Sequence, residues 1–429
     1  MAITRRQFIK QSAGVASVGM FLPRVWLGES QAQTPMGAAN RKMVVIQLIG
    51  GNDGLNTVIP YTNSRYYSLR PSLAFKQSEL KDDMDRSMLI SSDLALNPAM
   101  KEIKELYDEG KVAIINGVGY SQPSLSHFLS MDVWHTANLA GAGGIGWLGK
   151  YADAALIEKD GISAASIGGS LPKSLFASKS VIPSIQDFSL YNFITDPGHP
   201  EDYQNQLDAF TAASSRSFEP GAFRSAINMT AMDAVQGAQQ LQAAVASYSS
   251  RVAYPENNPL AAALKMAAQI LITMPEAALL YVMLGSFDTH SDQIDHRSGQ
   301  PNRLAGQHSS LIKWLSQAVK AFYEDLNQHG LADDVLIMEW SEFGRRPEEN
   351  ASLGTDHGTA NSMFVIGNPV RGGLYGEAPS LNALDLDSAG NVKFTVDFRS
   401  VYATILDRWL QGDSQSILGE KFENIGFLG

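Results

Sequence analysis

Acidic and imidazole side chains occur at several points where an apolar segment of the chain gives way to a glycine-rich one. Carboxylates and imidazoles are the ligands that zinc, manganese and related divalent ions take in proteins. If the apolar segments are neighbouring strands of one sheet, their ends can bring these groups to a single point. The candidate ligands are Asp53 in GGNDGLN, Asp288 and His290 in SFDTH, Glu342 in SEFGRR, and Asp356 and His357 in GTDHG. Together they predict a metal site.

Each of these residues also has an ordinary structural interpretation, and the sequence leaves both open. Asp53 could cap the helix that follows it, and Asp288 could form an Asx turn. Glu342 could pair with Arg345 or Arg346. The metal-site hypothesis therefore depends on the joint placement of the residues and not on any one motif.

Ser126 is the candidate nucleophile. It lies in YSQPSLSHF, after a predicted strand and before an apolar helical run. Its hydroxyl can therefore stand at a helix N-terminus, where partial positive charge favours an alkoxide or a bound anion. A serine hydroxyl is not appreciably ionised near neutral pH, and metal coordination is a natural way to activate it. The alternative role of Ser126 is that of a plain helix cap.

The elements that must position these residues alternate between strands and helices. Apolar, β-branched runs predict strands, and apolar residues at helical spacing predict helices. Strands that are apolar throughout and alternate with helices indicate an α/β fold, with a largely parallel central sheet covered by helices on both faces. The predicted strands are 42–51, 112–119, 277–286, VLIMEW and SMFVIG, and the predicted helices include 96–110, 309–330 and DFRSVYATILDRWLQG.

Residues 202–274 have a different character, because they are helical in pattern and rich in Ala and Gln. No repeat of fixed period is visible in this segment, so an inserted helical layer or cap is favoured over a coiled-coil partner site. We therefore expect a single domain, residues 42–429, with a helical insertion at about 202–274.

The first residues have the pattern of an export signal. TRRQFIK is followed by a mildly apolar stretch and then ESQAQ, which resembles a twin-arginine signal peptide spanning residues 1–32, with a linker at 33–41. The apolar stretch is short and rich in glycine, so no stable membrane span is expected in the mature form. We expect export by the twin-arginine (Tat) machinery and a periplasmic or secreted location.

Composition narrows the chemistry further. The 429 residues carry a formal net charge of -11, which disfavours nucleic acid or an anionic membrane surface as a partner. There are no cysteines, which excludes disulfides, thiolate metal sites and a cysteine nucleophile. Any metal must therefore bind to His, Asp, Glu or hydroxyl groups.

The motifs, in the order in which they occur along the chain, resemble those of the alkaline phosphatase and sulfatase superfamily. They resemble more closely its Tat-exported bacterial branch, known as domain of unknown function 1501. The motifs that carry the resemblance span nearly the whole mature chain. They are the twin-arginine start, GGNDGLNTVIPY, PSLSHFLSMDVW, GSFDTHSDQ, SEFGRRPEEN, GTDHGTA and GGLYG. The resemblance implies an alkaline-phosphatase-like α/β fold that binds one or two divalent ions.

In that superfamily a first aspartate and a serine or threonine nucleophile share one metal with a later Asp-His pair. A second metal takes an aspartate and two histidines. The resemblance implies that Asp53 is the first aspartate and that Ser126 is the nucleophile. It also implies that Asp288 and His290 bind the second metal.

Two alignments of the stretch from residue 341 to residue 367 remain open. In the first, Asp356 and His357 are the late Asp-His pair. In the second, Ser341 and Glu342 follow the strand that normally ends in that pair, and His357 is the final histidine. The second alignment has one imidazole fewer, which shifts the expected preference from Zn toward Ca, Mg or Mn. The spacing after Asp288 also departs from the usual pattern, so His296 and His308 are substitutes for His290.

The first functional hypothesis is an exported, metal-dependent hydrolase of phosphate or sulfate esters. Its nucleophile is Ser126 or a metal-bound water, and Arg345 or Arg346 holds a small or polymeric anionic substrate. A sulfatase site of the type C/S-x-P-S-R is disfavoured, because Leu125 replaces the arginine and cysteine is absent. The second hypothesis is a non-catalytic envelope protein that retains the fold and serves in binding or assembly.

Overall fold

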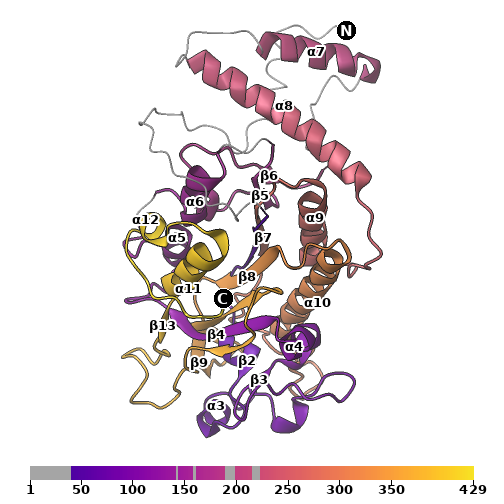
Figure 1. The fold of residues 1–429 in the computed structure, drawn as a ribbon. Helices are drawn as coiled ribbons and strands as arrows, with labels where there is room; N and C mark the ends of the chain where they lie inside the picture. Colours follow the sequence, from indigo (N-terminus) through magenta and orange to yellow (C-terminus); the bar gives the residue numbers. More distant parts are fainter. Residues whose placement is uncertain (1–39, 142–143, 158–160, 189–198, 215–222) are drawn as a thin grey trace.

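A mixed, mostly parallel sheet forms the centre of the protein (Figure 1). The computed structural model describes residues 40–141, 144–157, 161–188, 199–214 and 223–429. The predicted signal at 1–32 and most of the linker at 33–41 lie outside these residues. Within them the strand order is β12-β4-β11-β8-β1-β7-β5-β6, with β13 paired to β4. The strands are β1 (Lys42–Leu48), β4 (Val112–Gly119), β5 (Ala164–Ile167), β6 (Ser184–Ile185), β7 (Leu279–Leu284), β8 (Val335–Ser341), β11 (Asn361–Ile366), β12 (Gly373–Tyr375) and β13 (Val396–Asp397).

Strand β1 is the centre of this sheet, and both of its neighbours run parallel to it. Val44 lies opposite Leu280 of β7 on one side and opposite Ile337 of β8 on the other. Strand β11 is antiparallel to β4 and β8, whereas the other pairs in the described part of the sheet are parallel. The predicted α/β class with a largely parallel sheet is therefore confirmed.

The apolar sequence of β1 follows from its position. All seven of its residues are buried. Val44 and Ile46 face one hydrophobic core, while Met43 and Val45 face the other. Because successive side chains of a strand point to opposite faces, a strand with a core on both sides has no polar face.

Helices cover both faces of the sheet (Figure 1). One face is packed by α4 (Lys101–Asp108), α9 (Pro259–Thr273) and α10 (Gln307–Gln328), and the other by α5 (His127–Thr136), α6 (Trp147–Ala155), α11 (Phe398–Ile405) and α12 (Ser414–Leu418). Helix α10 follows the predicted helix closely and stops before Gly330, whose φ of +72° ends the helical backbone. Single-turn 3-10 helices lie at Gln77–Glu79, Pro98–Met100, Lys173–Leu175 and Pro200–Asp202, and a π-helical turn lies at Leu406–Leu410.

The segment from 202 to 274 comprises three helices. These are α7 (Tyr203–Ser214), α8 (Phe223–Ser247) and α9. Figure 1 shows α7 and α8 at one end of the molecule, beyond β5 and β6, whereas α9 packs on β7 and α10 as part of the covering layer. Of these three helices, α7 and α8 extend beyond the sheet, although Leu241 and Ala244 of α8 join the core on the α9 side.

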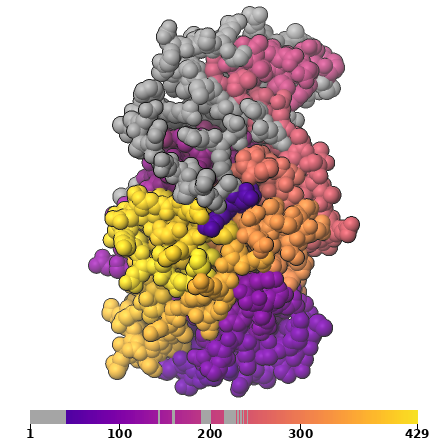
Figure 2. Space-filling model, viewed as in Figure 1, coloured from indigo at the N-terminus to yellow at the C-terminus, as the bar shows by residue number. Residues whose placement is uncertain are grey.

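Two small sheets and two short helices lie at the end of the molecule opposite α7. They are β2 (Val58–Ile59) with β3 (Ala95–Leu96), β9 (Arg345–Glu349) with β10 (Thr355–His357), and helices α2 (Gly54–Thr57) and α3 (Ser64–Leu69). Helix α3 contacts β9, and in Figure 2 the purple N-terminal surface borders the orange later segments at this end. Of the helices that the structure describes, none combines the length and apolar character needed to cross a membrane.

Candidate metal centre

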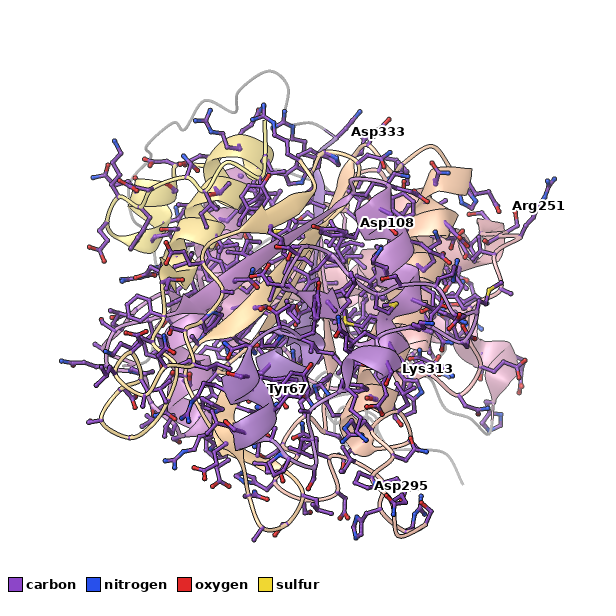
Figure 3. All side chains as sticks on the ribbon, turned by 90° about the horizontal axis from the view of Figure 1, so that it is seen from below. Tyr67, Asp108, Arg251, Asp295, Lys313 and Asp333 are labelled. Carbon is purple, nitrogen blue, oxygen red and sulfur yellow. The ribbon has the colours of Figure 1, made fainter. Side chains whose placement is uncertain are left out.

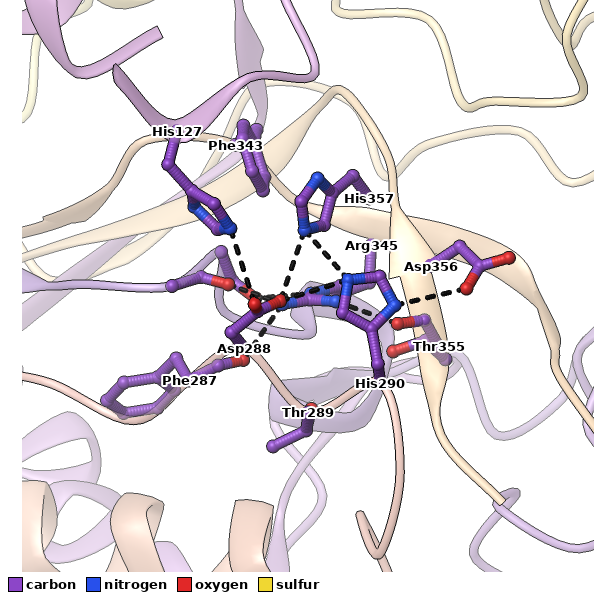
Figure 4. Close-up of polar contacts among 12 residues, drawn as sticks. His127, Phe287, Asp288, Thr289, His290, Phe343, Arg345, Thr355, Asp356 and His357 are labelled. Carbon is purple, nitrogen blue, oxygen red and sulfur yellow. Dashed lines mark hydrogen bonds and ion pairs between the residues drawn. The ribbon is translucent and has the colours of Figure 1, made fainter. Parts of the chain in front are cut away.

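The candidate site forms where the carboxyl ends of β1, β7 and β8 meet. Asp288 follows β7 and Glu342 follows β8, as the parallel sheet requires. The β9–β10 hairpin brings His357 to the same place, and α5 contributes His127 as its first residue (Figure 4). Four segments that are far apart in the sequence therefore surround one carboxylate.

Three imidazole nitrogens converge on Asp288 (Figure 4). His127 Nε2 lies 3.5 Å from Oδ2 of Asp288. The Nε2 atoms of His290 and His357 each lie 3.1 Å from Oδ1, and they are 2.9 Å from each other. His127, Asp288 and His357 each offer one ligand atom within 4.8 Å of the others. His290 adjoins this group on its more exposed side.

The opposite nitrogen of each histidine faces an oxygen acceptor. Nδ1 lies 2.8 Å from Oε1 of Glu342 for His127, 2.7 Å from the backbone oxygen of Leu125 for His357, and 3.1 Å from Oδ1 of Asp356 for His290. A backbone oxygen or a carboxylate accepts a proton, so these partners assign the ring proton to Nδ1. The three Nε2 atoms then carry lone pairs that point at one another and at a carboxylate.

Such an arrangement is stabilised by a cation. Two lone pairs 2.9 Å apart repel unless a proton or a cation lies between them. Ligands of a tetrahedral zinc ion at its usual bond lengths are roughly 3.4 Å apart. Within the group of His127, Asp288 and His357, the carboxylate lies 3.5 and 3.1 Å from the two imidazole nitrogens, which is close to that value. The donor set, nitrogen-rich with one carboxylate, fits zinc or a similar borderline ion better than Ca or Mg.

Charge and exposure agree with this fit. Burial raises the pKa of Asp288, but the hydrogen bond from Arg345 and the nearby His357 outweigh it and hold this pKa at about 2. The hydrogen bond to Glu342 raises the pKa of His127, whereas burial lowers the pKa of His357. The side chain of Asp288 is 46% exposed and that of His127 is 24% exposed. An ionised carboxylate thus stands where an ion can reach it from solvent.

The guanidinium of Arg345, which the sequence predicts to hold the substrate, is hydrogen-bonded to other groups of the protein. The residue is buried, and its guanidinium donates to the backbone oxygens of Gly50, Gly51, Phe287 and Thr355. It also donates to Oδ1 of Asp288. Arg345 therefore orients Asp288 and ties the ends of β1 and β7 together. Arg346, the alternative clamp, is partly exposed.

Asp53, predicted as a ligand, lies in a closed ion pair. Its carboxylate receives two hydrogen bonds from Arg70, of 2.6 and 2.9 Å, and another from Gln293. Both partners of the Asp53–Arg70 pair are fully buried. Burial raises the pKa of Asp53, but Arg70 and Gln293 together bring it below its ordinary value. The structure does not bring Asp53 into contact with the three histidines.

The other predicted ligands fall into two groups: residues of the cluster around Asp288, and residues that face the outer nitrogens of its histidines. Asp288, His290 and His357 are at the centre. Glu342 and Asp356 face the outer nitrogens of His127 and His290. Of the substitutes for His290, His308 is buried against Asn52, and His296 is exposed on a loop. Neither is among the residues that the structure brings to Asp288.

Ser126 precedes His127 directly and is the N-cap residue of α5. Its side chain makes no capping hydrogen bond and the residue is partly buried. Because its neighbours Leu125 and His127 both contact the cluster, Ser126 lies beside the histidines.

His127 is the residue that sequence analysis missed. It was noticed only as the neighbour of Ser126, because a histidine at the start of a predicted helix carries no pattern of its own. The available signal was its position directly after the loop that leaves β4, in the motif PSLSHF. Phe343 was also given no role, and its ring packs against His127 at 4.9 Å and against His357 at 4.7 Å between centroids.

The fold and site thus define an α/β protein with a histidine-rich candidate metal centre at the carboxyl edge of its sheet. The family model described as "Protein of unknown function (DUF1501)" matches residues 40–420. The chain belongs to this family, as the motifs predicted. The comparison with curated proteins gives no match.

Several solved structures are distantly similar. A lipoteichoic acid synthase from Listeria monocytogenes has 10% identity and a TM-score of 0.38, over 98% of this chain and 80% of that one. A sulfatase from Pseudoalteromonas sp. has 13% identity and a TM-score of 0.39, over 91% and 72%. A phosphonate monoester hydrolase from Agrobacterium radiobacter has 9% identity and a TM-score of 0.36, over 89% and 78%. Scores this low carry no argument about the activity of this chain.

Proposed function

We propose that the protein is an exported, metal-dependent hydrolase of phosphate or sulfate esters. The observation that carries the proposal is the convergence of three imidazole nitrogens on Asp288 while the opposite nitrogen of each ring faces an oxygen. With the ring protons on Nδ1, the three Nε2 atoms are directed at the same space, which is an arrangement that a divalent cation stabilises.

The residues that would hold the ion are His127, Asp288 and His357, with His290 beside them. A bound divalent ion would supply Lewis acidity toward an ester oxygen and lower the pKa of a hydroxyl at the site. Arg345 keeps Asp288 oriented and ionised. Phe343 packs against the rings of His127 and His357.

Ser126 is the nucleophile in this proposal, with water as the alternative. It stands at the N-terminal end of α5, where the helix dipole and free backbone N–H groups favour negative charge. The same end attracts the anionic oxygens of a phosphate or sulfate ester. Ser126 therefore has both a position beside the ligands and an environment suited to an oxyanion.

The proposed location rests on residues outside the described structure. The twin-arginine pattern near the N-terminus supports Tat export to the periplasm or beyond. The absence of cysteine means that the protein needs no disulfide chemistry in that compartment. Cleavage of the chain after export, detected by N-terminal sequencing of the periplasmic protein, tests this part.

The decisive experiment combines metal analysis with turnover of chromogenic phosphate and sulfate esters. We expect the purified protein to bind zinc or a related ion and to hydrolyse at least one ester class. Asp288→Asn should abolish both properties, and Ser126→Ala should lower turnover at least about 100-fold while metal binding persists. Asp333→Asn is the matched control, because Asp333 precedes β8 at the opposite end of the sheet and lies at the edge of the molecule (Figure 3).

Each outcome discriminates between hypotheses. A protein that binds no metal and turns over no ester would refute the proposal. Metal binding without turnover of any ester would favour the non-catalytic envelope protein. Turnover that survives in Ser126→Ala would assign the attack to water.

A further inference from the structure

Glu342 occupies an unusual place for a carboxylate. It follows the last residue of β8 and is fully buried. Its Oε1 accepts a 2.8 Å hydrogen bond from the backbone N–H of Gly50 and lies 2.8 Å from Nδ1 of His127. The hydroxyl of Ser341 lies 3.1 Å from its other oxygen. The carboxylate is thus buried, and its Oε1 atom faces both the Gly50 N–H and the His127 ring.

These contacts determine which nitrogen of His127 carries the proton. A backbone N–H can only donate, so Oε1 of Glu342 acts as an acceptor. The separation of 2.8 Å between Oε1 and Nδ1 is that of a charge-assisted hydrogen bond and requires a proton between the two atoms. With that proton on Nδ1, the lone pair of His127 lies on Nε2, which faces Asp288 at 3.5 Å.

Of the three acceptors behind the histidines, Glu342 is the buried carboxylate. His357 relies on a backbone oxygen, and His290 relies on Asp356, whose side chain is 52% exposed. Electrostatic interactions are stronger away from water. The Glu342–His127 hydrogen bond is therefore less screened than the Asp356–His290 hydrogen bond. Glu342 also connects three separate segments, since Gly50 follows β1 and His127 begins α5.

We propose that Glu342 is a positioning residue that holds His127 in the Nδ1–H tautomer and presents its Nε2 atom as a ligand of the metal centre. The inference rests on the proposed metal-binding function but concerns a different residue from those that contact the ion. It assigns to Glu342 an orienting role in place of direct ligation. Carboxylates that orient ligating histidines commonly raise metal affinity by about 10–100-fold.

The first test needs no metal, and it reads the tautomer in the wild-type protein. Nitrogen-15 NMR of histidine-labelled, chelator-treated protein distinguishes Nδ1–H from Nε2–H rings, and the signal of His127 is identified by its loss in His127→Asn. We expect the Nδ1–H form. An Nε2–H ring at His127 in the wild-type protein would overturn the proposal.

The second test measures zinc affinity by competition with a chromophoric chelator. Glu342→Leu removes the acceptor and should lower the affinity about 10–100-fold, with a mixture of tautomers at His127. Glu342→Gln retains one carbonyl acceptor and should restore the Nδ1–H ring and part of the affinity. The matched control is Glu339→Leu, because Glu339 is also a buried glutamate on β8 and contacts none of the described histidines.

The outcomes separate this proposal from the proposed function. Wild-type affinity and an Nδ1–H ring in folded Glu342→Leu would contradict the role of Glu342 while leaving the metal site intact. If Glu342→Leu does not fold, Glu342→Gln and the wild-type tautomer decide the question. A wild-type protein that binds no zinc but shows the Nδ1–H ring would refute the metal function and leave the orienting contact standing.

Discussion

Asp288 and Asp53 are both aspartates at strand ends, yet their surroundings differ. Asp288 shares a single oxygen with Arg345 and remains 46% exposed. Asp53 is fully buried and both of its oxygens are bonded to Arg70. The difference lies in the surroundings, because Arg70 and Gln293 bond to both oxygens of Asp53 inside the protein, whereas Asp288 keeps its Oδ2 atom outside the contact with Arg345.

Asp53→Ala should therefore destabilise the protein without removing the metal site. The substitution leaves the charge of Arg70 buried and unpaired, which costs about 3–5 kcal/mol. Urea denaturation measures the loss, and the zinc affinity of the folded variant should stay within about threefold of wild type. In a double-mutant cycle, Asp53→Ala with Arg70→Met should lose less than the sum of the single changes. A stable Asp53→Ala protein that has lost zinc would instead make Asp53 a ligand.

Helix α5 determines where His127 stands. Trp134 of this helix stacks on Trp340 of β8 at 5.1 Å and on Phe398 of α11 at 4.4 Å between ring centroids. Ser130, one turn after Ser126, donates to the backbone oxygen of Glu342. The helix is thus packed at its middle and bonded near its start, so its first residue is held at the carboxyl end of β8.

The carboxyl ends of β1 and β7 approach each other closely, and this approach predicts the effect of a substitution at Gly50. Gly50 has a φ of +122°, and a Cβ added there would lie 2.4 Å from the backbone nitrogen of Asp288. Gly50→Ala should push the two strand ends apart, lowering the melting temperature and weakening zinc binding at least about tenfold. Calorimetry and chelator competition measure the two effects.

Gly110→Ala is the control for Gly50→Ala. Gly110 also has a positive φ, of +74°, but nothing lies within 4 Å of an added Cβ. Its replacement should cost only the backbone strain of about 1–2 kcal/mol and leave zinc binding unchanged. Equal effects of the two substitutions on zinc binding would show that the approach of the strand ends is not what shapes the site.

At the scale of the whole molecule, buried neutral histidines link stability to pH. Burial lowers the pKa of His135 and of His308 from 6.5 to about 4. The unfolded chain then binds protons below pH 6.5 that the folded chain does not bind. The contribution of these two histidines to the free energy of unfolding should accordingly be greatest above pH 6.5. It should fall between pH 6.5 and 4 and stay constant below pH 4.

The expected slope is at most about 1.4 kcal/mol per pH unit for each histidine. Urea denaturation at pH 7.5, 6 and 5 in the presence of a chelator measures it, so that metal binding does not contribute. His135→Gln should make the slope shallower, because one of the two groups is removed. A free energy of unfolding that stays constant from pH 7.5 to 5 would contradict the burial of neutral histidines.

The sequence by itself determined the class of fold and the edge of the sheet where the site lies. Strands such as β1 and β8 are mostly apolar because they are buried on both faces, and this local pattern can be recognised without the rest of the chain. The placement of Asp288 and Glu342 after β7 and β8 follows from the same pattern. The family motifs are likewise continuous stretches of sequence.

Only the tertiary structure decided which strand-end residues share one site. Arg70 pairs with Asp53 across 17 residues, and Glu342 meets His127 across 215. The sequence pattern of a carboxylate after a strand is the same in three different surroundings. The carboxylate can face a guanidinium, the Nδ1 atom of an imidazole, or solvent. Its role depends on the partner that folding brings to it, and a long-range partner leaves no periodic trace in the chain.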